Sequence, residues 1–153
     1  MRVGWHREEV FFNSIEPRDF VILQRMQTVV SSGIKVSLET KYEQKFSSPL
    51  TDNYVFSYFI TIENQNEYEV QLIRRHWFIF DSCGIRREVE GPGVVGEQPV
   101  IAPGASYSYQ SACDLLSMRG TMHGFYTVQR LPDRVPFRVE IPRFRMETPV
   151  SLN

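Results

Sequence analysis

The chain has 153 residues, which is the size of one domain and enough to bury a core without disulfide support. Its residues are 42% hydrophobic and 23% charged, a composition too apolar for a disordered protein. The formal net charge of −1 gives no overall attraction to nucleic acid or to a membrane surface, and we expect neither as a partner.

The N-terminal part, residues 1–30, has no clean period of 2 or 3.6 residues, and we expect an extension that is non-native or loosely packed. A short helix from Arg18 to Thr28 fits this stretch, with Pro17 near its start. Met26 stands just before the first well-patterned strand and is a candidate for the natural start. The sandwich domain is then expected to cover residues 31–153.

From residue 33 onward the pattern is that of β-structure, with turn residues at intervals of roughly ten. Residues 70–80 are apolar on both faces, as in a central strand, and Pro142 predicts a bulge or an edge position. These features predict an all-β, immunoglobulin or fibronectin type III-like antiparallel β-sandwich of seven or eight strands. The expected strands are residues 34–42, 54–62, 70–80, 86–90, 106–113, 122–130 and 136–146, with a further short segment at 100–104.

The sharpest motif is G-P-G-V-V-G at residues 91–96, which fits the G-x-G-x-x-G pattern of dinucleotide-binding folds. Those folds place a helix directly after the last glycine, and Pro99 and Pro103 forbid such a helix here. Two interpretations remain open. Either the loop amides bind an anion, or the loop needs glycine for its backbone angles. The residues concerned are Gly91, Gly93 and Gly96.

A second candidate is the run Arg74-Arg75-His76-Trp77. On a strand, Arg74 and His76 share one face while Arg75 and Trp77 share the other. One arginine must therefore lie beside core aromatics and needs a carboxylate or backbone carbonyls as partner. The alternative is that these arginines and His76 grip phosphate beside the glycine loop. The carboxylates available on neighbouring strands are Glu63, Glu88 and Glu90.

The sequence shows no constellation typical of catalysis or metal binding. The histidines and the two cysteines, Cys83 and Cys113, lack zinc-ligand spacing, and no nucleophile motif is present. We therefore expect no enzyme, no metal and no cofactor. With no apolar leader and too few cysteines for a disulfide framework, we expect a cytoplasmic location with reduced thiols. A group of aromatics is expected in the core, with a binding groove as the alternative: Tyr107, Tyr109, Phe125 and Tyr126.

Several segments resemble the ApaG family: N-Y-V-F-S-Y-F-I-T-I-E-N at residues 53–64, R-H-W at 75–77 and G-P-G-V-V-G-E-Q-P at 91–99. A-P-G at 102–104 and P-R-F at 142–144 fit as well, so the resemblance covers residues 33–149. It implies a fibronectin type III-like sandwich in a cytoplasmic bacterial protein, with a link to cobalt tolerance and magnesium efflux. It implies no catalytic residues. The usual short bacterial form lacks residues 1–25.

These observations favour a non-enzymatic binding module whose sandwich face or glycine loop engages a protein partner not identified by the sequence. The alternative is a binder or sensor of nucleotide polyphosphates, such as a dinucleoside tetraphosphate or pyrophosphate. Its site would be the amides of residues 91–96 with Arg74, Arg75 or His76. This alternative predicts that a charge placed at Gly93 removes ligand binding without unfolding the domain. Exposed edge strands leave both a monomer and a homodimer open.

Overall fold

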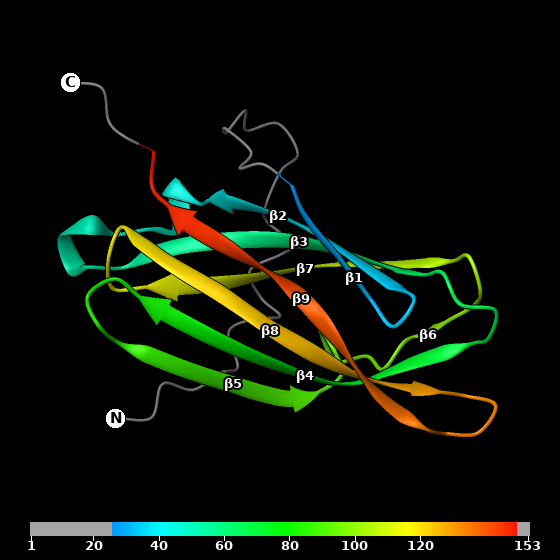
Figure 1. The fold of residues 1–153 in the computed structure, drawn as a ribbon. Helices are drawn as coiled ribbons and strands as arrows, with labels where there is room; N and C mark the ends of the chain where they lie inside the picture. Colours follow the sequence, from blue (N-terminus) through cyan, green and yellow to red (C-terminus); the bar gives the residue numbers. More distant parts are fainter. Residues whose placement is uncertain (1–25, 150–153) are drawn as a thin grey trace.

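The computed structural model describes residues 26–149, which form a sandwich of two antiparallel sheets (Figure 1). The four-stranded sheet has the order β1-β2-β3-β7 and the five-stranded sheet the order β5-β4-β8-β9, with β6 also paired to β4. The first sheet contains β1 (Gln27–Ser31), β2 (Ile34–Tyr42), β3 (Tyr54–Asn64) and β7 (Ser106–Leu115). The second contains β4 (Val70–Asp81), β5 (Arg86–Pro92), β6 (Val100–Ile101), β8 (Arg119–Arg130) and β9 (Pro136–Glu147). The predicted all-β sandwich is confirmed.

Two 3-10 turns, η2 (Gln44–Phe46) and η3 (Pro49–Thr51), join β2 to β3. In the part of the chain from residue 26 to residue 149, no helix has the length and apolar character needed to cross a bilayer.

The core lies between the sheets and is filled by every second side chain of the paired strands. In β2, Ile34, Val36 and Leu38 are buried and alternate with half-buried polar residues, as the sequence pattern predicts. Two of the aromatics weighed for a groove, Tyr109 and Tyr126, lie in this core with their hydroxyls hydrogen-bonded to each other. Burial raises the pKa of both phenols, so they stay protonated. This bond links β7 to β8 across the core.

The strand β9 confirms the prediction made from Pro142. It lies at the edge of the five-stranded sheet, and its register with β8 shifts between Met122 and Gly124. Met122 is opposite Phe144 whereas Gly124 is opposite Ile141, so β9 has one extra residue at this point, next to the proline. Strand β5 is likewise an edge strand, as its charges indicated.

The strand β1 was not expected. The sequence analysis placed Gln27 and Thr28 at the end of a helix, but both are extended and pair with β2. Ser31, at the end of β1, accepts a hydrogen bond from the backbone N–H of Glu140 in β9 at 2.9 Å, which joins the edges of the two sheets. The rest of the expected helix and the extension before Met26 lie outside the described residues.

A buried carboxylate closes one end of the five-stranded sheet. Asp81 is 2% exposed and accepts hydrogen bonds from the backbone N–H groups of Leu116 and Cys83 and from the hydroxyl of Ser117. Burial alone would raise the pKa of Asp81, but the hydrogen bonds together outweigh burial and hold its pKa below the usual 3.8. The ionised carboxylate therefore orders the loop from β7 to β8.

We expect this group to make stability depend on pH. Because the folded pKa of Asp81 is depressed, its contribution is present above the unfolded pKa and is lost as pH falls through the folded value. Asp81→Asn should lower the free energy of unfolding by about 1–3 kcal/mol at pH 7 and flatten its fall in acid. Urea unfolding of both proteins from pH 7 to pH 2 measures this. Parallel curves for the two proteins would contradict it.

Candidate functional site

The glycine segment, residues 91–97, contains a tight hairpin turn that follows β5. The backbone N–H of Val94 donates to the carbonyl of Glu97 at 2.8 Å, and that of Glu97 donates back to Val94 at 2.9 Å. The two residues between them, Val95 and Gly96, both have positive φ, +43° and +78°. Two consecutive central residues at positive φ are the mark of a type I′ turn. We call residues 94–97 the glycine turn.

Gly93, just before the turn, is required for packing as well as for backbone angle. Its φ is +60°, and a Cβ placed on it would lie 2.0 Å from the carbonyl oxygen of Glu97. Only glycine allows this approach of backbone to backbone. Any side chain at this position collides with the turn itself, so we expect a charge at Gly93 to disturb the turn as well as any ligand bound to it.

The amides of this segment are partly occupied. The N–H of Gly93 donates to the carbonyl of Ile73 in β4 at 2.8 Å, and that of Val94 is used within the turn. The N–H groups of Val95 and Gly96 have no hydrogen-bond partner among residues 26–149. The loop thus presents two adjacent donors at its tip instead of a ring of amides.

Arg75 lies on the inner side of β4 and supports the glycine segment. Its Nη1 donates to the backbone carbonyls of Pro92 and Gly93, both at 3.0 Å. The guanidinium also lies over Gly91, where an added Cβ would be 3.2 Å from Nη1. The sequence analysis predicted that the inward-facing arginine needs a carboxylate or backbone carbonyls as its partner, and in the structure Arg75 has carbonyls. The glutamates named in the sequence analysis do not pair with Arg75.

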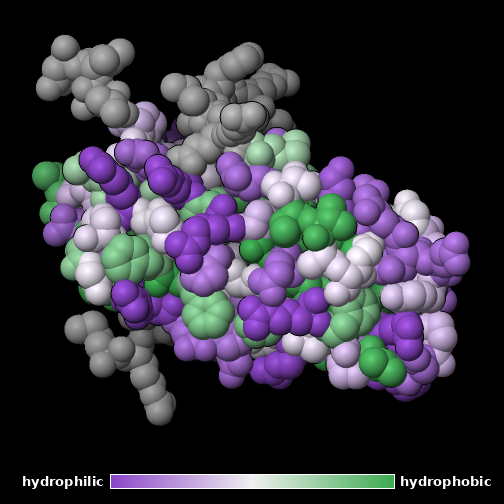
Figure 2. Space-filling view, viewed as in Figure 1, coloured by the Kyte–Doolittle hydropathy of each residue, from purple (hydrophilic) through white to green (hydrophobic). Residues whose placement is uncertain are grey.

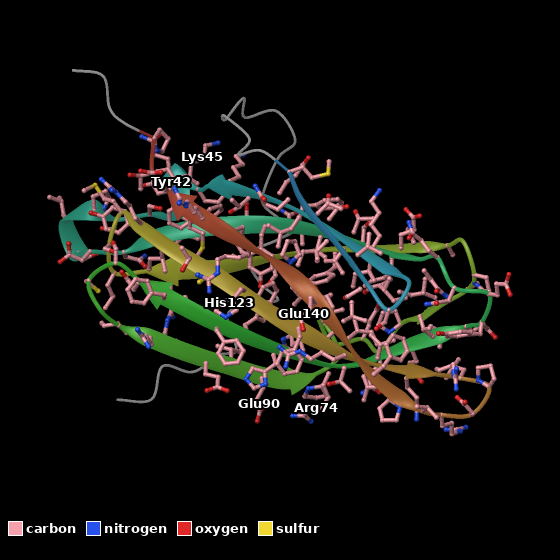
Figure 3. All side chains as sticks on the ribbon, in the orientation of Figure 1. Tyr42, Lys45, Arg74, Glu90, His123 and Glu140 are labelled. Carbon is pink, nitrogen blue, oxygen red and sulfur yellow. The ribbon has the colours of Figure 1, made fainter. Side chains whose placement is uncertain are left out.

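Arg74 and His76 lie on the opposite, outer side of β4. Arg74 is exposed, and Figure 3 shows it on the same face as Glu90 and His123. His76 faces two carboxylates of β5: Nε2 is hydrogen-bonded to Glu88 and Nδ1 lies 3.4 Å from Glu90. The structure therefore does not bring Arg74, Arg75 and His76 together. Arg75 alone meets the glycine segment through polar contacts.

Sequence reasoning missed a stack of planar groups on this outer face. His76 lies between Phe78 and Phe125, with ring centroids at 4.7 and 4.9 Å. His123 stacks on Phe78 at 5.2 Å, and the guanidinium carbon of Arg138 lies 3.8 Å from the centroid of Phe125. The only feature of the sequence that points to this stack is that each of two strands has two rings at alternate positions, His76 and Phe78 in β4 and His123 and Phe125 in β8. Their contact depends on the register of β4 with β8.

The groups of this stack offer little capacity for catalysis or metal binding. The four rings are half-buried and stack on one another. Burial and the nearby charge of Arg143 lower the pKa of His123, which leaves it neutral at pH 7. In residues 26–149, no group of three or more His, Cys, Asp or Glu side chains is arranged to hold a metal ion. We therefore interpret the stack as a structural feature that stabilises the five-stranded sheet.

A shallow pocket of about 430 Å³ lies at one end of the sandwich. Arg130, one of its lining residues, is paired with Asp133 and lies over the ring of Tyr68 at 5.3 Å. None of the residues of the glycine turn lines it. The lining residues are Ser32, Asn66, Tyr68, Arg130, Val135 and Phe137.

Comparison with known proteins gives a consistent result. The model of the ApaG domain matches residues 44–130. The chain is 44% identical to Protein ApaG of Brucella suis, over 81% of this chain and 95% of that protein. It is 41% identical to Protein ApaG of Proteus mirabilis, over 80% and 98%. The X-ray structure of a Northeast Structural Genomics Consortium target superposes with a TM-score of 0.74, at 40% identity and over 81% and 93%.

Proposed function

The chain belongs to the ApaG family, and we propose that it is a non-enzymatic binding module that presents the glycine turn to a protein partner. The observation that carries this proposal is Val95, which is held at a φ of +43° with 40% of its surface exposed. Type I′ turns favour Asn, Asp and Gly, and a β-branched residue at positive φ is strained. Strained residues of this kind cluster at functional sites, where the surrounding structure holds them in place.

The turn is also held rigidly, which suits recognition. Arg75 fixes the carbonyls that lead into it, and its two ends bond to each other. The carboxylate of Glu97 accepts a hydrogen bond from the hydroxyl of Tyr107 in β7 at 2.8 Å, which ties the turn to the other sheet. A pre-organised turn loses little conformational freedom when it binds. On the side that Figure 2 shows, the hydrophobic side chains form only small separate patches.

We expect Val95→Asn to separate stability from binding. Asparagine adopts positive φ readily, so the free energy of unfolding should rise by about 0.5–1 kcal/mol. Loss of the apolar side chain should at the same time weaken binding to the partner. Urea unfolding measures the first effect. A stabilised variant that no longer binds cannot be explained by unfolding, whereas a stabilised variant that binds as before would contradict the proposal.

The binding test uses a photo-crosslinking amino acid at position 95 of the full chain in cells. The matched control is position 85, because Ile85 is 42% exposed in the turn between β4 and β5, close to the 40% of Val95. We expect a discrete crosslinked product from position 95 only. Excess wild-type protein should compete it away, and excess Val95→Asn should not. Equal products from both positions, or competition by both proteins, would count against the glycine turn.

A second candidate function is favoured by one observation, the two unused amides at the tip of the turn, with an exposed Arg74 opposite Pro92 in the neighbouring strand. They suit a nucleotide polyphosphate, although Nη1 of Arg75 is already bonded to backbone carbonyls and the ring of His76 is bonded to Glu88. Calorimetric titration with diadenosine tetraphosphate, with and without magnesium, tests it. Saturable binding that is lost in Arg74→Met supports this function, and no heat at millimolar ligand excludes it. A cytoplasmic location and a link to cobalt tolerance and magnesium efflux are further proposals, made from family membership.

A further inference from the structure

Among the described strands, β7 forms an open edge of the four-stranded sheet. It pairs with β3 on one side, and no described strand pairs with the other. Val55, opposite Asp114, uses its own N–H and carbonyl on Ser47 and Glu43, so the backbone groups of Asp114 point away from β3. Arg87 of β5 donates to that outward carbonyl. Because these groups alternate along an antiparallel strand, a row of further residues opens the same way: Ser106, Ser108, Gln110 and Ala112.

The other three edges of the sandwich carry protective features, whereas on β7 only one end is covered, where Arg87 bonds to the carbonyl of Asp114. Strand β5 is densely charged and ends in Pro92, β9 contains Pro142 with its bulge, and β1 has only five residues. Strand β7 has ten residues with no lysine, no proline and no register shift. Natural proteins block long flat edges with such devices unless the edge is used for pairing.

We propose that β7 pairs antiparallel with β7 of a second copy of this chain, about a two-fold axis at Gln110. In this register Ser108 faces Ala112 of the second copy, so no like charges are opposed, and the pairing stops short of Asp114, whose carbonyl is taken by Arg87. A closed two-fold contact uses the same patch on both copies. The net charge of −1 adds little repulsion between them. The small uncharged side chains along this edge permit pairing with the same edge of a second copy. They offer few features by which a strand of a different protein could be recognised.

Sedimentation of the full chain over a range of concentrations tests this proposal. We expect a monomer that becomes a dimer as concentration rises. Gln110→Lys places two ammonium groups opposite each other and should weaken dimerisation at least about tenfold. Thr28→Lys, an equal charge change on the exposed edge strand β1 of the same sheet, should leave it unchanged. A monomer at every concentration, or equal weakening by both variants, would overturn the proposal.

A covalent test does not depend on how Gln110→Lys folds. Residues that oppose each other across paired strands lie about 5.5 Å apart between Cα atoms, which a disulfide can span. In a Cys83→Ser background, which removes the exposed native thiol, Gln110→Cys should give a linked dimer on mild oxidation. Thr28→Cys should remain a monomer. A linked dimer from Thr28→Cys alone, or from neither variant, would show that β7 is not the contact.

Discussion

Gly93→Ala is expected to lower the free energy of unfolding by about 2–4 kcal/mol, because two costs add. The first is backbone strain, since residue 93 has a φ of +60°. The second is a collision, since the new Cβ would lie 2.0 Å from the carbonyl oxygen of Glu97. That oxygen belongs to the backbone of the turn and accepts the N–H of Val94, so it cannot move without breaking the turn.

Gly104→Ala is the matched control. Gly104 has a φ of +74°, but a Cβ there would meet nothing within 4 Å, so only the strain of about 1 kcal/mol remains. Urea unfolding of both variants isolates the collision as the difference between them. Equal losses would mean that the turn accommodates a side chain at position 93. The packing explanation of this glycine would then fail.

Much of the fold could be predicted because its strands follow simple rules. The alternation from Ile34 to Tyr42 fixed both ends of β2, since one face of the strand is buried and the other is not. Pro142 identified the position of β9, because a residue without an N–H cannot continue a central ladder. Strand β1 was missed because its five residues are mostly exposed and have little periodicity to detect.

The candidate site was harder because its features depend on conformation and register. Nothing in the sequence indicates that Val95 adopts positive φ, since valine disfavours that region. The G-x-G-x-x-G pattern left an anion site and a conformational role for the glycines both open. The structure shows the conformational role, a close backbone approach and a tight turn, while the anion site stays a prediction. The contact between His76 and Phe125 follows only from the pairing of β4 with β8.

The two neighbouring arginines of β4 show how strand geometry separates similar residues. A strand sends successive side chains to opposite faces, so Arg75 points inward to the glycine segment while Arg74 remains in solvent. Arg75 provides donors to carbonyls in a half-buried site, where an unpaired carbonyl is costly. Its role is therefore to hold the turn in shape, and any partner of the turn depends on it indirectly.

Arg75→Met is accordingly expected to lower the free energy of unfolding by about 2–4 kcal/mol. Methionine keeps the apolar stem but leaves the carbonyls of Pro92 and Gly93 without their donor. The same change at Arg74 should alter stability by no more than about 0.5 kcal/mol, as at most exposed sites. Hydrogen exchange should show faster opening of the Gly93 amide in Arg75→Met only. If Arg74→Met proved equally destabilising, or if exchange at Gly93 were unchanged in Arg75→Met, Arg75 would not be the residue that holds the glycine turn.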